Sequence, residues 1–346
     1  MSKFILFLRH AVALIREDKL FASIYVAGTA VAIASAMVIA IVFNMMLADI
    51  PPESNRSRTL YVYSLFIPAE KADNVPYHLG HSPVALDSCY RHMKCVEAAT
   101  GILPAREHRF SIAGFSSTDR TDTENATVSA IATDPDFFRL YELTFLNGRP
   151  FSEKEFRDGE RVCVVTDKVV EQTGGGSTVE INGKPFRVVG VVKAVSAFLE
   201  DATADVYMPY TVEGMGFYPK YQKSQRKRDE YLSVSYSGNL SARILLREGC
   251  TLKDFNAELE PIRQQYSAVI SSQLGEKVEW AVNARTHFFH MINFFRPDRA
   301  EDQGLALEAM NLMPPAILML LFLFLPAINL SGLVSNRMEA RRAEMG

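Results

Sequence analysis

The sequence has little excess charge of either sign, few cysteines and a single tryptophan. Its 37 Lys and Arg residues nearly balance 40 Asp and Glu residues, and the net charge of the 346-residue chain is −3. A general nucleic-acid-binding protein needs a basic face that displaces counterions from phosphates, so this composition argues against nucleic acid as a partner. Because 48% of the residues are hydrophobic, the chain can bury enough surface to offset the entropy of ordering, which excludes a disordered protein.

Motifs of catalysis are missing as well. The Gly183-Lys184 pair is followed by Pro185 instead of the Ser or Thr of a P-loop, and neither G-x-S-x-G nor H-E-x-x-H occurs. The run Gly174-Gly175-Gly176 leads into a predicted strand instead of a helix, so we interpret it as a turn and not as a phosphate loop. We therefore expect that the chain is not an enzyme and that it holds no cofactor.

Histidines and cysteines are present but do not form a recognisable metal site. His78, His81, Cys89 and His92 offer the imidazole and thiolate groups that zinc favours, yet their spacing fits no common zinc pattern. We expect no metal.

The four cysteines would permit disulfides in an exported domain. Cys89 and Cys95 would point to different sides of the helix predicted over residues 83–94, where they would bond poorly. Cys163 and Cys250 are interpreted as buried residues at strand ends.

Charge is absent from two long stretches, residues 20–48 and residues 309–336. At about 1.5 Å per residue, a helix over the first stretch is longer than the roughly 30 Å hydrocarbon core of a bilayer requires. The apolar region of a cleaved signal peptide is shorter, about 7 to 15 residues. We therefore predict two transmembrane helices, over residues 20–48 and 309–335.

Basic residues lie at both ends of the chain. They are Lys3, Arg9, Arg16 and Lys19 before the first stretch, and Arg337, Arg341 and Arg342 after the second. The positive-inside rule then places both termini in the cytoplasm and exports residues 49–308. This predicts a multi-pass protein of the inner (cytoplasmic) membrane with one large periplasmic domain.

Residues 1–19 have an apolar stripe at helical spacing opposite basic residues, which predicts an amphipathic helix in contact with membrane lipid. Two interpretations fit this stripe. It is either a solvated membrane-entry segment or a helix that lies in the inner interface, and the sequence alone does not separate the two.

Small residues recur every four positions in the first predicted span, at Gly28, Ala32, Ala36 and Ala40. Small side chains on one face let helix backbones approach closely in lipid. We expect this face to pack on another helix, either the second span or a second subunit.

The exported segment is predicted to be an α+β domain, with strands where β-branched and aromatic residues gather. The predicted strands are residues 59–67, 96–103, 107–115, 127–133, 162–166, 178–181, 185–192, 231–237, 242–247 and 277–284. The predicted helices are residues 83–94 and 251–271. Asn182-Gly183 predicts a tight hairpin turn. The order of these elements predicts a split βαβ core interrupted by a β-rich insertion.

The helix over residues 251–271 has the clearest signals outside the membrane. Its apolar residues follow a spacing of three and four, and Thr251 with Asp254 is placed like a capping box. Pro261 inside it predicts a kink or a break.

Several segments together resemble one family, the ABC-transporter permeases of the macrolide-exporter (MacB) and FtsX type. Residues 132–151 (ATDPDFFRLYELTFLNGRPF) are similar to the D-x-x-F-F and G-R-x-F segment of the family, and residues 178–193 (TVEINGKPFRVVGVVK) to its N-G hairpin. Residues 329–346 (NLSGLVSNRMEARRAEMG) resemble the second span of the family running into its R-R-x-E-[IM]-G coupling motif.

The resemblance implies a MacB-like periplasmic core domain, with the core formed by residues 59–103 and 240–295 and the β-rich insertion by residues 104–239. It also implies that residues 336–346 begin a cytoplasmic coupling region. In that region Arg341, Arg342, Glu344, Met345 and Gly346 would face an ATPase subunit. Members of the family have two further spans, so the sequence is expected to represent the first half of their architecture.

The leading functional hypothesis is a permease subunit that transmits ATP-driven motion from a separate cytoplasmic ABC ATPase to its periplasmic domain. Efflux, lipoprotein release and activation of a cell-wall hydrolase all stay open as the task. The expected partners are the ATPase, a second copy or a paired permease, and a periplasmic protein. The alternative is a two-span sensor whose periplasmic domain binds a ligand, although little sequence follows the second span to form an output domain.

Overall fold

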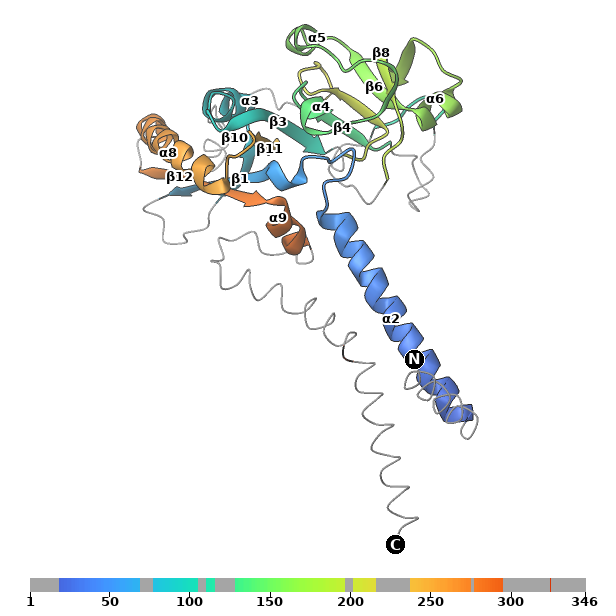
Figure 1. The fold of residues 1–346 in the computed structure, drawn as a ribbon. Coiled ribbons are helices and arrows are strands. Elements are labelled where there is room, and N and C mark those ends of the chain that lie inside the picture. Colours follow the sequence, from blue (N-terminus) through green and yellow to red (C-terminus); the bar gives the residue numbers. More distant parts are fainter. Residues whose placement is uncertain are drawn as a thin grey trace. The chain divides into compact units, whose positions relative to one another are not determined.

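Figure 1 shows the fold in a computed structural model, which describes residues 19–68, 77–104, 110–115, 128–196, 202–215, 237–274 and 277–294 together with Phe324. The chain divides into two compact units, Met1–Leu47 with Met291–Gly346, and Ala48–His290. Apart from Lys19 and Phe324, the predicted interfacial helix, the second span and the coupling region lie outside the described residues.

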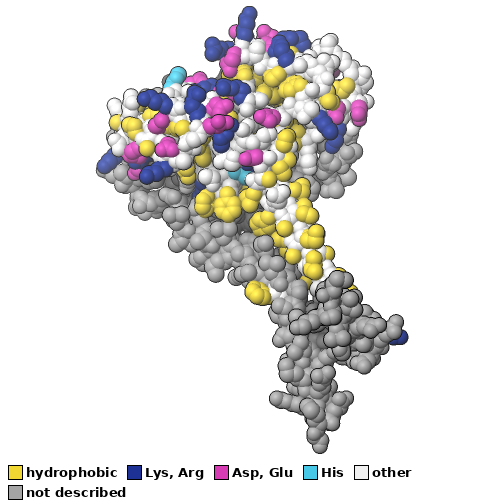
Figure 2. All heavy atoms as spheres, in the orientation of Figure 1, with side chains coloured by type: hydrophobic (Ala, Val, Ile, Leu, Met, Phe, Trp, Pro, Cys, Tyr) yellow, Lys and Arg dark blue, Asp and Glu magenta, His cyan; other side chains and the backbone are white. Residues whose placement is uncertain are grey.

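Helix α2 (Lys19–Leu47) forms where the first span is predicted. Its segment Val26–Leu47 has 22 residues and a mean hydropathy of 2.4, so by length and composition it can cross a membrane. It is the one helix with these properties in the part of the chain that the structure describes. Apolar side chains such as Val31 and Met37 are more than half exposed. Figure 2 shows hydrophobic side chains along the surface of this helix. Exposed apolar surface of this extent is typical of a membrane or protein contact.

The first half of the core is a strand-helix-strand unit. Its elements are β1 (Thr59–Pro68), β2 (Tyr77–His81), α3 (Pro83–Ala85), the π-helical turn η2 (Leu86–Tyr90) and β3 (Val96–Pro104). The Ser82 hydroxyl accepts from the Ala85 N–H at 3.1 Å and caps the helix. The helical segment ends at Tyr90, short of the predicted end, because the Met93 N–H donates to the Tyr90 carbonyl and turns the chain into β3. Strand β2 was not predicted from the sequence.

The second half repeats this order with β11 (Ser241–Leu246), α8 (Leu252–Leu274) and β12 (Val278–Thr286). The predicted capping box of α8 is confirmed, since the Thr251 N–H donates to Asp254 Oδ2 at 2.8 Å and the Asp254 N–H to Thr251 Oγ1 at 3.4 Å. The helix is not broken at Pro261. Leu259 and Tyr266 are buried on either side of the proline, and their packing offsets the hydrogen bond that it removes.

The two halves interleave in one sheet. β1 is antiparallel to β11 along one edge and to β12 along the other, and β11 is antiparallel to β3. β1 and β3 therefore run parallel with β11 between them, and β11 and β12 run parallel with β1 between them. This arrangement confirms an α+β fold with mutually dependent halves. On this sheet α8 packs beside β12 (Figure 1), where the Tyr266 and Trp280 rings are 5.0 Å apart.

The insertion extends the same sheet beyond β3 and adds short helices. Its elements are β4 (Ala130–Thr133), α4 (Phe137–Leu140), β5 (Phe145–Gly148), α5 (Glu153–Arg157), β6 (Val162–Thr166), α6 (Asp167–Thr173), β7 (Thr178–Ile181), β8 (Lys184–Val192) and β9 (Val206–Pro209). From β3 the sheet continues in the order β4-β9-β6-β8-β5, with β7 beside β8. Strand β10 (Ser237–Gly238) pairs with β2. Helix α9 (His287–Phe294) follows β12.

The predicted hairpin between β7 and β8 is confirmed, because Asn182 and Gly183 have φ values of 49° and 72°. The prediction of a strand over residues 107–115 is wrong for the described residues 110–115. Phe110 and Ile112 make only isolated bridges, to Val128 and Ile181. Strand β4 begins at Ala130, later than predicted. Most of the strand predicted at residues 231–237 lies outside the described residues.

All four cysteines are free. Cys163 is buried in β6 as predicted, whereas the prediction for Cys250 is wrong, because its side chain is half-buried. Cys250 lies in the turn before α8, where its N–H donates to the Arg247 carbonyl at 3.1 Å. A turn at the end of a strand leaves such a side chain partly in solvent.

Candidate functional site

The small residues of α2 differ in exposure. Ala32 is buried, Gly28 and Ala36 are half-buried, and Ala40 is exposed. Their role in helix packing stays a prediction. The predicted ATPase-coupling residues lie outside the described residues, and their role stays a prediction as well. These residues are Arg341, Arg342, Glu344, Met345 and Gly346.

The D-x-x-F-F segment holds a fully buried carboxylate where the insertion leaves the core. Asp134 Oδ2 lies 3.0 Å from Arg91 Nη2 and accepts from the Gly101 N–H at 3.0 Å. Asp134 Oδ1 accepts from the Asp136 N–H at 3.1 Å, and the Tyr210 hydroxyl approaches Oδ2 at 3.5 Å. Burial raises the pKa of Asp134 to about 6, against the opposing effects of Arg91 and the Gly101 N–H. The carboxylate, which follows β4, thus joins Arg91, a backbone N–H of β3 and the hydroxyl of the residue after β9.

Arg91 is the cation of this cluster, and the end of the helical segment η2 positions it. Its guanidinium donates to the Ala99 carbonyl through Nε and Nη2, at 3.2 and 3.1 Å. It also pairs with Asp87 on its own helix and lies 3.3 Å from Asp136. One arginine therefore contacts three carboxylates, and its pairing with Asp134 is how that buried charge is tolerated in the interior.

The two phenylalanines of the same segment anchor α4. Phe137 is fully buried, with ring centroids 4.6 Å from Tyr141 and 5.6 Å from Tyr207. Phe138 meets Phe151 edge to face at 5.1 Å. Aromatic pairs in this geometry stabilise a fold by about 0.5 to 1.5 kcal/mol beyond their burial. Phe151 is the last residue of the G-R-x-F motif, so the two motifs of this segment pack against each other.

The glycine of G-R-x-F permits a close backbone approach. Gly148 has φ +72°, and a Cβ on it would lie 2.2 Å from the Val189 carbonyl oxygen. The Arg149 N–H donates to that same carbonyl at 3.0 Å. Only glycine fits here, because both the backbone conformation and the space exclude a side chain.

The arginine of G-R-x-F holds a second buried carboxylate. Arg149 donates to both oxygens of Glu155, at 2.8 and 2.9 Å, and Arg187 adds a third bond at 3.0 Å. Ser152 and Glu155 also form a capping box at the start of α5. The Arg149 guanidinium holds the pKa of Glu155 well below its usual range.

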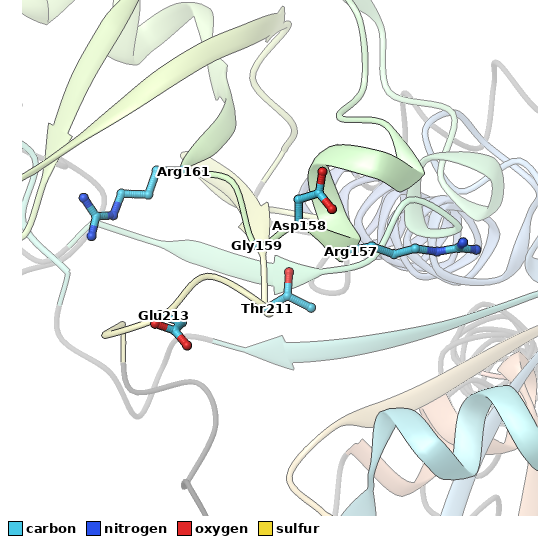
Figure 3. A pocket seen from close by; sticks show the side chains of 6 residues that line it. All are labelled: Arg157, Asp158, Gly159, Arg161, Thr211 and Glu213. Carbon is cyan, nitrogen blue, oxygen red and sulfur yellow. The ribbon is translucent and has the colours of Figure 1, made fainter.

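A cavity of about 490 Å³ lies between the end of α5 and the loop after β9. It is lined by Arg157, Asp158, Gly159, Arg161, Thr211 and Glu213. In Figure 3 the side chains of Arg157 and Arg161 point away from each other, and that of Asp158 points away from Glu213. Because a ligand site needs polar groups that converge, this cavity does not support a small-molecule site.

A comparison with known families decides the assignment. The sequence profile of the MacB-like periplasmic core domain matches residues 22–262, well over half of the chain. The chain belongs to this family. This MacB-like chain therefore carries a periplasmic domain of the ABC-permease type, and the D-x-x-F-F and G-R-x-F segments lie within the matched residues.

Curated relatives match shorter segments. The uncharacterized ABC transporter permease YknZ of Bacillus subtilis (strain 168) is 28% identical over 98 residues, which are 27% of this chain and 24% of that protein. The macrolide export ATP-binding/permease protein MacB 2 of Aeromonas hydrophila is 30% identical over 89 residues, 24% of this chain and 14% of that protein. The matched parts are thus a quarter or less of these relatives.

Solved structures of the family also resemble the MacB-like chain. The periplasmic region of MacB from Actinobacillus actinomycetemcomitans aligns with 70% of this chain and 94% of its own, at 13% identity and a TM-score of 0.39. The extracellular domain of the noncanonic ABC-type transporter YknZ aligns with 64% of this chain and 99% of its own, at 12% identity and a TM-score of 0.37.

The sequence did not reveal which residues of this MacB-like domain form its buried polar clusters. Arg91 belongs to no recognised sequence motif, and its ion pair with Asp134 depends on the pairing of β3 with β4. One signal was available for Asp134. It is a charged residue directly after the apolar strand of residues 130–133, in a position where a carboxylate is buried only with partners.

Proposed function

We propose that this chain is the permease subunit of an ABC transporter and that it transmits ATP-driven motion from a separate cytoplasmic ATPase to its periplasmic domain. The observation that carries the proposal is the family match over residues 22–262, which includes most of α2 and the strands from β1 to β11. A domain that follows an apolar helix directly in the chain is suited to respond to movement of that helix.

The proposal gives both ends of the chain a cytoplasmic location and assigns the contact with the ATPase to residues 336–346. Arg341, Arg342 and Glu344 lie there, after the second predicted span. Their charged side chains suit a polar contact between subunits at the membrane surface. Efflux, lipoprotein release and hydrolase activation are all compatible with this proposal.

The experiment is purification of the tagged chain from its native membranes in a mild detergent. We expect an ABC ATPase subunit to co-purify, and the double variant Arg341→Ala with Arg342→Ala to reduce its recovery severalfold. Arg157→Ala is the matched control, because Arg157 is an exposed arginine of the outer domain. Recovery of the chain without any ABC ATPase would contradict the proposal.

A second copy of the chain, or a paired permease, completes the membrane unit in this proposal. Its contact is the face of α2 that carries Gly28, Ala32, Ala36 and Ala40, of which Ala40 is exposed on the single chain. A larger side chain at Ala40 would hold two backbones apart. We expect Ala40→Leu to lower the recovery of two differently tagged copies together, while Val31→Leu on another side of α2 leaves it unchanged. Equal recovery for both variants would exclude this face.

A further inference from the structure

Residues 48–58, here called the linker, join α2 to β1 and fold back on themselves. Glu53 and Arg56 are both 5% exposed and form an ion pair, with Arg56 Nε 2.6 Å from Glu53 Oε2. Arg56 Nη1 also donates to the Ala48 carbonyl at 2.9 Å, and the Ser57 N–H donates to Asp49 Oδ1 at 2.8 Å. Ala48, the residue directly after α2, is therefore held by the buried arginine of the linker, and Asp49 is held by the backbone of Ser57.

The linker is bound to the core sheet at its far end. Arg58 Nη1 lies 2.9 Å from Glu97 on β3 and donates to the Leu246 carbonyl at the end of β11, at 2.8 Å. Arg58 Nη2 donates to Asn55 Oδ1 at 2.8 Å. These bonds join the linker to strands from both halves of the core.

The linker is also bound directly to the insertion. The Glu142 N–H donates to the Pro52 carbonyl at 2.7 Å, and the Ser54 hydroxyl donates to Glu142 Oε2 at 2.9 Å. Asn55 Nδ2 donates to the Leu140 carbonyl, the last residue of α4, at 3.4 Å. These partners are 85 and 88 residues apart in the sequence.

This contact attaches the insertion to the linker, in addition to the pairing of β3 with β4 and the Arg91–Asp134 ion pair, which attach it to the core. Along the chain, the insertion is connected to the core only through the end of β3 and through the segment that leads to β11. The bonds of Pro52 and Ser54 to Glu142 bypass both connections. They end next to α4, whose Phe137 begins the aromatic cluster of the insertion. A shift of the linker would therefore act on the α4 segment directly through these bonds.

We propose that the linker couples the first span directly to the insertion, with Glu142 as the point of transfer and Arg56 as the positioning residue that keeps the linker rigid. The motion that drives this coupling comes from the proposed function, on which the coupling rests in this respect. The contacts between the linker and the insertion do not need the ATPase. Because coupling between two sites is reciprocal, disturbing the linker must loosen the α4 segment, and disturbing Glu142 must loosen the linker.

The test is hydrogen exchange, read by mass spectrometry, on the full chain in lipid nanodiscs. In Arg56→Gln, we expect the Glu142 amide to exchange at least about tenfold faster, since its acceptor Pro52 is no longer held. Amides of α8 should keep their rates. Arg157→Gln, a change of an exposed arginine, is the matched control and should alter neither region. Faster exchange in Arg56→Gln that is confined to the linker would overturn the proposal.

A second variant covers the case in which Arg56→Gln speeds exchange over the whole domain through loss of the fold. Glu142→Ala leaves the buried pair of Glu53 and Arg56 in place and removes only the acceptor of Ser54. Faster exchange of the Glu53 and Ser57 amides in this variant supports the coupling. Unchanged rates at both amides overturn it.

Addition of the co-purified ATPase and ATP separates the coupling from the proposed function. An ATP-dependent change of exchange in the insertion of the wild type, reduced severalfold in Arg56→Gln, supports both. Absence of any ATP-dependent change in the wild type contradicts the proposed function. The linker coupling is then still decided by the nucleotide-free rates of Arg56→Gln and Glu142→Ala.

Discussion

The carboxylate of Asp134 lies 3.0 Å from the guanidinium of Arg91, and this ion pair joins the insertion to the core. Asp134 follows β4 and is fully buried, whereas Arg91 follows the helical segment η2 and is one quarter exposed. The Gly101 N–H on β3 completes the contact at 3.0 Å. Loss of Arg91 would leave the buried Asp134 carboxylate without its cation, whereas Arg91 also contacts Asp87 and Asp136.

Removal of Asp134 should therefore be costly. Asp134→Ala leaves the Gly101 N–H and part of the Arg91 guanidinium without an acceptor, and we expect a loss of about 3 kcal/mol in the free energy of unfolding. Asp134→Asn keeps an acceptor and should lose about 1 kcal/mol. Urea unfolding followed by the emission of Trp280, the single tryptophan, measures both. The exposed Asp158→Ala should change stability by less than about 0.5 kcal/mol. Equal losses for Ala and Asn would contradict this account.

The pKa of Asp134 also predicts how its contribution varies with pH. Burial raises this pKa from 3.8 to about 6, so the folded state binds the proton more tightly than the unfolded chain. The resulting stability is fully present below pH 3.8 and is lost as the pH rises through about 6. Between pH 7 and pH 4, wild type should therefore gain up to roughly 3 kcal/mol relative to Asp134→Asn. A stability difference that stays constant over this range would show that Asp134 titrates normally.

Glu155 should show the opposite dependence. Its pKa is lowered by Arg149, so its contribution is present above the ordinary value of 4.5 and is lost as the pH falls below it. We expect Glu155→Gln to lose about 1 to 2 kcal/mol at pH 7, because the two arginines that hold it are half exposed and screened. The difference from wild type should shrink below pH 4.5 in urea titrations. Glu160→Gln, which removes a half-buried partner of Arg187, is the control and should have little effect at either pH.

Local signals were sufficient for the long elements of the core. The spacing of apolar residues and the capping box at Thr251 predicted α8. The β-branched and aromatic side chains within residues 59–67 predicted β1. Strand β2 could not be predicted in this way. Its sequence, YHLGH, has no β-branched residue, and it is a strand because Leu65 of β1 pairs with His78. Pairing with a neighbouring strand, and not the local sequence, determines the secondary structure of such a segment.

The site was less predictable than the fold. The sequence placed Asp134 and Phe137 in a family motif but could not show that Asp134 is buried or that Arg91 is its partner. Their contact requires the antiparallel pairing of β3 with β4, where Leu103 faces Ala132. The linker contact of Pro52 with Glu142 is of the same kind, since neither residue type indicates a partner so distant in the chain.

A comparison of alanine substitutions at two glycines distinguishes the cost of backbone strain from the cost of a steric clash. Gly148 and Gly174 have similar φ values, +72° and +79°, but a Cβ would meet the Val189 carbonyl oxygen at 2.2 Å in the first and nothing within 4 Å in the second. We expect Gly174→Ala to lose about 1 kcal/mol from the left-handed conformation alone. Gly148→Ala should lose at least about 3 kcal/mol, since β5 must also move away from β8. Equal losses in urea unfolding would mean that the backbone of Gly148 relaxes without cost.

Thiol reactivity tests the packing of the core under native conditions. Burial raises the pKa of Cys89 to about 11 and that of Cys95 and Cys163 to about 12, and the thiolate is the reactive form. Cys250 is half-buried at the turn before α8. We expect a maleimide at pH 7.5 to modify Cys250 first in the folded chain, with the other three following only in denaturant, and Cys250→Ser to abolish the fast phase. Rapid modification of Cys95 in that variant would show that the start of β3 opens from α8, because the Cys95 N–H lies 3.4 Å from the Glu258 carboxylate of that helix.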